Sequence, residues 1–137
     1  MILIEHDMDN IQVVQDVYKN FGERNVAGVL AHFDKNVVWM RPDAPEIPFC
    51  GTYKGHEGMI KFLTLVSQTI KIDSFVPTQF LANGDTVVVI GEDSAHVIST
   101  GKSYTTHWIQ VFVFKGKKIV QGRAYIDTLQ IAKACQP

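Results

Sequence analysis

The sequence has few cysteines, no run of basic residues and no long apolar stretch. Only two cysteines occur among 137 residues, so a disulfide framework like that of small secreted domains is not expected. Thirteen basic and fourteen acidic side chains give a net charge of −1. Without a basic cluster to contact phosphates, a nucleic-acid partner is not expected either.

The opening segment, MILIEHDMDN, holds a short apolar stretch followed by acidic residues. This pattern predicts neither a signal peptide nor a membrane span. We therefore expect a cytoplasmic protein that does not enter a membrane, with Cys50 and Cys135 both reduced.

Two short motifs resemble known binding signatures but lack residues that those signatures require. TGKS at 100–103 has the Lys-Ser of a phosphate-binding loop, yet His96 stands where a glycine is needed. HEGMI at 56–60 begins like a zinc-protease helix, but its fifth residue is Ile60 rather than a second histidine. His96 and His107 lie on neighbouring predicted strands and could meet, but a metal normally takes three or four ligands. The sequence predicts no metal and no organic cofactor.

The N-terminal half of the chain has a mainly helical period. One apolar stripe ends near Gly22, and Asn25 is a plausible N-cap for a second, shorter helix. A strand is predicted at 36–41, followed by a proline-rich loop, and a third helix is predicted at 57–69. The first stripe consists of Ile11, Val14, Tyr18 and Phe21.

From residue 73 onward the period of two that is typical of strands replaces the helical period. Pro77 interrupts the first of these segments, which predicts an edge strand or a bulged one. The four predicted strands cover residues 73–82, 86–99, 103–114 and 119–131. The element order predicts a single α+β domain over residues 1–137, in which the helices cover one face of a curved antiparallel sheet.

Both faces of the two central strands are apolar. On one strand Trp108, Gln110 and Phe112 share a face, and Ile109 and its neighbours share the other. Each apolar face must be shielded from water, so we expect helices to pack on one face and a partner subunit on the other. Alternation alone does not say which face is inside.

Three motifs occur in order along the chain. GTYKG at 51–55 opens the third predicted helix, WIQVFVFKGKKI at 108–119 contains the last hairpin turn, and YIDT follows at 125–128. Their order and spacing resemble the SnoaL-like family, which shares a cone-shaped fold with ketosteroid isomerase, limonene-epoxide hydrolase and nuclear transport factor 2. The resemblance implies a strongly bent sheet, a pocket between its concave face and the helices, and a homodimer formed through the outer face.

The residues that carry the chemistry of those relatives are not retained. In an alignment through Arg41-Pro42, Arg41 falls where ketosteroid isomerase has its general-base aspartate, and Gln110 falls where it has an oxyanion-stabilising aspartic acid. Ala124 falls where the epoxide hydrolases have a catalytic aspartate, and Val17 falls near the isomerase tyrosine. An arginine cannot abstract a carbon-bound proton as a carboxylate does, so isomerase or epoxide-hydrolase chemistry by those residues is not expected.

The same alignment places Trp39, Arg41, Glu92, Trp108 and Gln110 inside the pocket, with Phe112 on its wall. Glu92 would be an acid/base, and Arg41 or Gln110 would stabilise developing charge on oxygen. Proximity to Arg41 would lower the pKa of Glu92, whereas contact mainly with the tryptophans would raise it. A structural ion pair is the alternative interpretation.

Tyr18 is a further ligand-binding candidate, and two weaker candidates, Asp127 and His96, lie at the edges of this set. Tyr18 could direct its hydroxyl into the pocket or pack in the core. Asp127 could be an acid/base near the end of the sheet, but a strand-end or dimer-interface role is favoured, because the alignment turns it outward. His96 is retained only as a secondary candidate.

Three functional hypotheses follow. The first is a cofactor-independent isomerase, cyclase or dehydratase acting on an apolar carbonyl or polyketide-like compound. The second is a non-catalytic protein that binds a flat or acidic small molecule, with Trp39 and Trp108 stacking on it. The third is a dimeric interaction module.

Overall fold

The computed structural model describes residues 5–137, and the first four residues of the opening apolar segment lie outside this part. Within this part, four helices and six strands follow one another. They are α1 (Glu5–Gly22), α2 (Val26–Leu30), β1 (Phe33–Met40), β2 (Thr52–Lys54), α3 (Gly55–Thr69), β3 (Ile70–Asn83), β4 (Thr86–Val97), β5 (Ser103–Lys115), β6 (Lys118–Ile126) and α4 (Thr128–Cys135).

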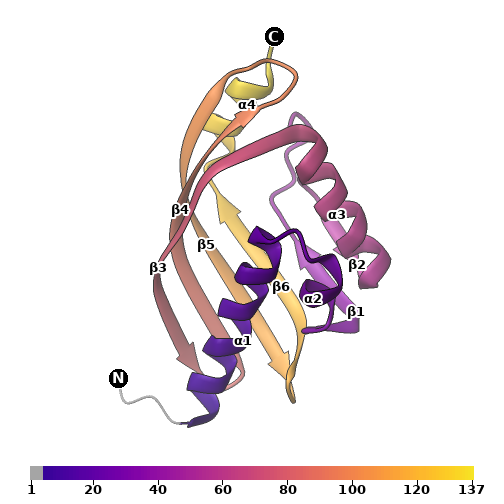
Figure 1. The fold of residues 1–137 in the computed structure, drawn as a ribbon, viewed down its shortest axis with the longest axis vertical. Helices are drawn as coiled ribbons and strands as arrows, with labels where there is room; N and C mark the ends of the chain where they lie inside the picture. The colour runs from indigo at the N-terminus through magenta and orange to yellow at the C-terminus, as the bar shows by residue number, and fades with distance from the viewer. Residues whose placement is uncertain (1–4) are drawn as a thin grey trace.

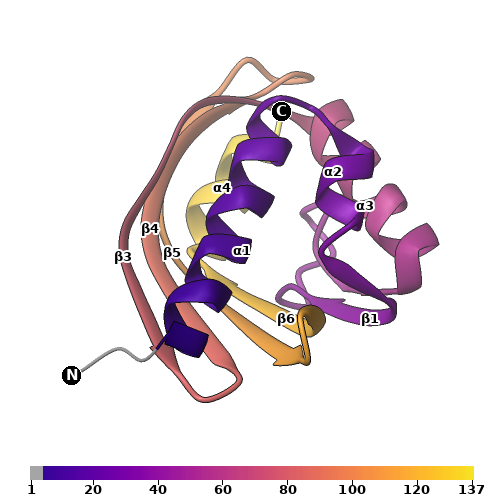
Figure 2. The same ribbon diagram turned by 60° about the horizontal axis from the view of Figure 1, so that its bottom comes forward.

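The six strands form one strongly curved sheet in the order β2-β1-β6-β5-β4-β3 (Figure 1). Strands β3 to β6 form an antiparallel meander, and β1 pairs parallel to β6, so the sheet is mixed. Helix α1 packs on β3 and β4, and α3 packs on β1 and β2. Figure 2 shows α1 and α4 inside the curve of the sheet. The predicted α+β fold, with three N-terminal helices on a bent sheet, is confirmed.

Pro77 lies where the sequence predicts it. Strand β3 is at the edge of the sheet, and its register with β4 shifts between Pro77 and Gln79. An edge strand tolerates the missing proline N–H, and the irregularity absorbs the break in the ladder.

The end of the chain differs from the prediction. The last strand was expected to run through 119–131, but β6 ends at Ile126 and α4 follows. Asp127 is the N-cap of α4, and its side chain accepts a hydrogen bond from the backbone N–H of Gln130. An aspartate in this position satisfies a backbone donor that the helix leaves unpaired, which ends the strand and starts the helix.

Two tryptophans lie flat against glycines on neighbouring strands. Trp39 pairs with Gly122, and a Cβ at Gly122 would lie 2.2 Å from the Trp39 ring. Trp108 pairs with Gly91, where a Cβ would lie 2.3 Å from its ring. Each glycine provides space that any larger residue would fill, so the two indoles are fixed against the concave face of the sheet.

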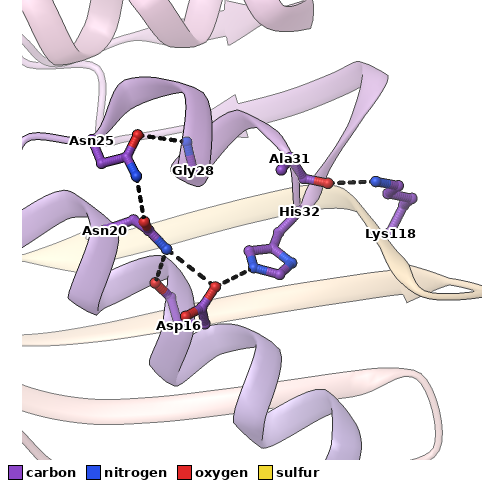
Figure 3. A network of polar contacts seen from close by, with 7 residues as sticks. All are labelled: Asp16, Asn20, Asn25, Gly28, Ala31, His32 and Lys118. Atoms are coloured by element: carbon purple, nitrogen blue, oxygen red, sulfur yellow. Dashed lines mark hydrogen bonds and ion pairs between the residues drawn. The ribbon is translucent and has the colours of Figure 1, made fainter.

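A polar network fixes α1 against α2 and the start of β1 (Figure 3). The Asn25 side chain caps α2 by accepting from the Gly28 N–H and donates to Asn20 on α1. The His32 Nε2 lies 2.5 Å from Asp16 Oδ2. The hydrogen bond to His32 is the main reason why the pKa of Asp16 is lowered. These contacts hold α1 across the concave face of the sheet.

Candidate functional site

A cavity of about 90 Å³ lies between the concave face of the sheet and helices α1, α3 and α4. Most of its wall is aliphatic or aromatic, which is typical of a small-molecule site. Eight lining residues carry polar groups: Tyr18, Trp39, Arg41, Asp93, Tyr104, Thr106, Trp108 and Gln110.

Strand β5 supplies the floor of the cavity, because its alternate residues from Tyr104 to Phe112 face inward. Trp108 and Phe112 are buried and lie 6.0 Å and 6.1 Å from the Tyr18 ring. The Tyr18 hydroxyl donates to Gln110 Oε1 at 2.8 Å. Burial strongly raises the pKa of Tyr18, so this hydroxyl stays protonated and orients the amide.

Six of the seven residues predicted for the main site line this cavity, and their predicted roles stay predictions. They come from α1, from β1 and the residue that follows it, and from β5, which the sheet and helix packing bring together. They are Tyr18, Trp39, Arg41, Trp108, Gln110 and Phe112.

The predicted position of Glu92 is wrong. Its side chain is 51% exposed on the outer face of the sheet. There Glu92 Oε2 lies 3.7 Å from Nδ1 of His107, which is on the same face. Asp93 lines the cavity instead. The pairing of β4 with β5 explains the difference, because Gly91 lies opposite Trp108 and Asp93 lies opposite Thr106. Directly paired residues point to the same face, so the odd-numbered residues of β4 share the inner face of β5.

Asp93 is the one carboxylate among the cavity-lining residues that the structure describes. The Thr106 hydroxyl donates a short hydrogen bond to Asp93 Oδ1. Burial raises the pKa of Asp93, and both the hydrogen bond from Thr106 and the charge of Arg41 oppose this rise. A carboxyl group with a raised pKa in a cavity is a candidate acid/base.

Arg41 brings a cation into the same cavity. Its guanidinium lies between the rings of Phe49 and Phe62, at 5.2 Å and 5.3 Å from their centres, where cation–π attraction is favourable. Burial lowers the pKa of Arg41, and nearby Cys50 is the largest opposing influence. Among the side chains that the structure describes, no carboxylate lies within ion-pair distance of Arg41.

A wider groove of about 840 Å³ adjoins the cavity. It runs between α1, α3 and β3, and its walls carry Lys19, Arg24 and Lys71. Eight apolar or aromatic residues line both spaces: Tyr18, Phe21, Val29, Leu63, Val66, Ile70, Ile72 and Phe75. The groove is therefore the approach to the cavity from outside.

The two weaker candidates lie outside the cavity. Asp127 is exposed and caps α4. His96 Nδ1 lies 3.2 Å from Asp73 Oδ2 on the edge strand. His96 pairs with Ser103, and His107 pairs with Glu92, so the two histidines are separated along the sheet and do not meet.

Sequence reasoning missed Asp93, Tyr104 and Thr106. The two residues on β5 could have been found, because they have the same parity as Trp108 and Gln110. The inward orientation of Asp93 depends on the register between β4 and β5, and the hydrophobic pattern alone does not predict this register.

Neither a membrane-spanning helix nor a metal centre is found in the described part of the chain. No helix among residues 5–137 is both long and apolar enough to cross a membrane. Within the same range no three His, Cys, Asp or Glu side chains gather as metal ligands would.

Comparisons with solved structures agree with this architecture. A protein like nuclear transport factor 2 from Burkholderia xenovorans LB400 is 29% identical, with a TM-score of 0.88 over 95% of this chain and 98% of that one. A protein of the same type from Burkholderia pseudomallei K96243 is 27% identical, with a TM-score of 0.85 over 94% and 98%. TerC, co-crystallised with polyporic acid, shares the fold at 24% identity, with a TM-score of 0.80 over 94% and 99%.

A search of curated proteins found no significant match. The family model for SnoaL-like domains matches residues 14–122, from the middle of α1 through β5 to the middle of β6. This match spans most of the cavity wall, and the chain belongs to the SnoaL-like domain family.

Proposed function

We propose that this domain catalyses proton transfer beside the carbonyl group of a small apolar molecule, as an isomerase, cyclase or dehydratase without a cofactor. The observation that carries the proposal is the pair formed by Asp93 and Arg41. Both line one apolar cavity, and the charge of Arg41 acts on Asp93 without a direct ion pair between them. A bound substrate would lie between the base and the cation.

The chemistry follows from the two charges. The Asp93 carboxylate takes a proton from the carbon beside the carbonyl, and the electron pair of that C–H bond forms the C=C bond of an enolate. The negative charge that develops on the carbonyl oxygen is stabilised by Arg41 in a site with little water. Asp93 then returns its proton to a different carbon. Its raised pKa makes it a stronger base than an exposed aspartate.

A non-catalytic binding protein is the second candidate. The contact between Tyr18 and Gln110 favours it, because the tyrosine hydroxyl proton is used within the protein rather than offered to a ligand. Gln110 has no acidic proton to supply in its place. The cavity would then hold a flat molecule without changing it.

Isomerisation of 3-cyclohexen-1-one to its conjugated isomer tests the catalytic proposal, because this one-ring ketone needs only one proton to be moved from one carbon to another and the product is followed by ultraviolet absorbance. We expect Asp93→Asn to lower the rate by about 10²- to 10⁴-fold, as loss of a general base does. Glu92→Gln is the matched control, since Glu92 is the neighbouring carboxylate on the opposite face. An unchanged rate in Asp93→Asn contradicts the proposal, and a wild-type rate no higher than that in buffer favours the binding protein.

A further inference from the structure

Three buried N–H groups around the cavity have no hydrogen-bond acceptor among the described residues. They are Trp39 Nε1, Arg41 Nε and Trp108 Nε1. The two tryptophans are only 4% and 3% exposed, and all three residues line the same cavity. Buried donors are almost always paired in folded proteins, so three unpaired donors at one cavity call for acceptors that the protein itself does not supply.

The donors come from separate places on the cavity wall. Trp39 is on β1 and Arg41 follows the end of that strand, whereas Trp108 is on β5. Strand β6 lies between β1 and β5, so neighbouring positions on these two strands are about 10 Å apart. A ligand that satisfies both indoles therefore needs acceptor atoms on more than one edge.

The charge of the ligand follows from Arg41. Its guanidinium is held by two phenylalanine rings and has no carboxylate within ion-pair distance in the described part of the chain. A buried cation is normally paired with an anion. Cys50 beside it does not provide one, because burial raises the pKa of this thiol. Asp93 lines the same cavity but makes no ion pair with Arg41, so an anionic oxygen of the ligand is the direct partner that the guanidinium lacks.

The size of the enclosed space limits what enters it. A cavity of about 90 Å³ is smaller than the engineered cavity of about 150 Å³ that binds benzene. The enclosed part of the ligand is therefore no larger than one ring. Any further part must lie in the adjoining groove, which is much larger and shares eight lining residues with the cavity.

We propose that the cavity binds the planar, one-ring end of an anionic molecule that carries acceptor oxygens on opposite edges, as in hydroxylated aromatic acids and cyclic enols. Arg41 pairs with the anionic oxygen, and the indole N–H groups of Trp39 and Trp108 donate to the other oxygens. The rest of the molecule extends along the groove between α1, α3 and β3. This inference concerns binding and rests on the proposed function only for the reaction. Among such molecules Asp93 would act on those that keep a C–H bond beside a carbonyl, such as cyclic enols, whereas aromatic acids would bind without being changed.

A matched pair of probes tests the inference with the wild-type chain. 4-Hydroxybenzoate is planar, has one ring and carries oxygens at both ends. 4-Nitrotoluene has nearly the same shape but no charge and weaker acceptors. Affinities are measured by calorimetry. Binding at the donors is measured by N–H correlation spectroscopy, in which the two tryptophans of the chain give two indole signals.

We expect 4-hydroxybenzoate to bind at least about tenfold more tightly than 4-nitrotoluene and to shift both indole signals downfield. In Arg41→Met the affinity for the acid should fall at least about tenfold, whereas that for 4-nitrotoluene should change less than about threefold. Equal or tighter binding of 4-nitrotoluene overturns the inference. Indole signals that do not shift when the acid is bound would also overturn the inference, as would the absence of any binding of the acid up to about 5 mM.

Asp93→Asn separates this inference from the proposed function. It removes a negative charge from the cavity, so 4-hydroxybenzoate should bind at least as well as in the wild type, while isomerisation of 3-cyclohexen-1-one is lost. Binding of the acid without any isomerisation by the wild type would contradict the proposed function alone. Isomerisation that depends on Asp93, together with a preference for 4-nitrotoluene, would contradict the substrate class alone.

Discussion

Asp93 and Thr106 lie directly opposite each other across β4 and β5, and the Thr106 hydroxyl donates to the Asp93 carboxylate. This hydrogen bond is the main influence that favours the charged form of Asp93, but burial outweighs it. The carboxylate is thus held in a position where its charge costs stability. Acid/base residues are commonly found in such positions, because the features that tune their pKa also strain the fold.

We predict that Asp93→Asn stabilises the protein at about pH 7 by roughly 0.5–2 kcal/mol. The folded-state pKa is raised above the ordinary value of 3.8, so the wild type is destabilised as pH rises through that folded-state value. Below 3.8 the carboxyl is neutral in both states, and the advantage of the amide should disappear. Urea unfolding followed by tryptophan fluorescence at acidic and neutral pH measures the difference.

Glu92→Gln is the control for this prediction, because Glu92 is exposed on the outer face. Its free energy of unfolding should change by less than about 0.5 kcal/mol. A variant Asp93→Asn that is less stable than the wild type at neutral pH would contradict the interpretation of Asp93 as a strained carboxylate.

The error at Glu92 shows which part of the site could be predicted from the sequence. Alternation divided β1 and β5 into two faces each, and the resemblance chose the inner one, which places Trp39, Arg41 and Trp108 correctly. Strand β4 is apolar on both faces, so its phase depends on its register with β5. That register is a non-local property, since one residue of slippage turns every side chain to the opposite face.

Other features of the fold had local signals of unequal strength. Pro77 marked the edge strand correctly, because a missing N–H is a local constraint. Asp127 followed three residues later by Gln130 is a helix-start signal, yet the alternation of the preceding strand concealed it. The packing of Trp39 on Gly122 and of Trp108 on Gly91 could not be predicted, because it depends on which strands pair. Neither glycine reveals its partner from the local sequence.

Tyr18→Phe should destabilise the protein by about 0.5–1.5 kcal/mol, the usual net contribution of one hydrogen bond. The substitution removes the hydroxyl that donates to Gln110 Oε1 and leaves a buried amide oxygen without this donor. Urea unfolding measures the change. Restoration of stability in the double variant Tyr18→Phe/Gln110→Leu, which replaces both polar groups, would confirm the cause, whereas additive losses would contradict it.

Gly122→Ala should destabilise the protein by about 1–3 kcal/mol, as overpacking does. The new Cβ would lie 2.2 Å from the Trp39 ring, so the indole must move toward the cavity. Unfolding in urea and the emission wavelength of tryptophan report both effects. Gly22→Ala is the control, because nothing lies within 4 Å of a Cβ there, and it should be neutral or stabilising. Equal stability of Gly122→Ala and the wild type would contradict the tight packing.

Asp16→Asn should weaken the contact between α1 and His32, which lies directly before β1, at neutral pH and have little effect in acid. The folded-state pKa of Asp16 is lowered, mainly by the hydrogen bond with His32. The corresponding stabilisation is therefore present above the ordinary value of 3.8 and is lost as pH falls through the lower, folded-state value. Thermal unfolding across this range measures it, with exposed Asp43→Asn as the control. A loss of stability that persists unchanged in acid would exclude the charge of Asp16 as its source.

The outer face of the sheet is the surface on which we predict a homodimer. Ile109 is 40% exposed and Tyr125 is 50% exposed on this face, with Val111 and Val113 partly exposed beside Ile109. Neighbouring apolar side chains on a sheet face usually mark an interface, because their contact with water is unfavourable. Light scattering at micromolar concentration should therefore give twice the mass of one chain.

Ile109→Glu should convert this dimer to a folded monomer, because a carboxylate buried at the centre of an apolar interface lacks a partner. Ile60→Glu is the matched control: Ile60 is 45% exposed but lies on α3 beside the groove rather than on the outer sheet face, and this variant should remain a dimer. Circular dichroism establishes that both variants are folded before their masses are compared. A wild type that is monomeric at these concentrations, or an Ile109→Glu variant that still dimerises, would show that this face is not where two copies of the chain meet.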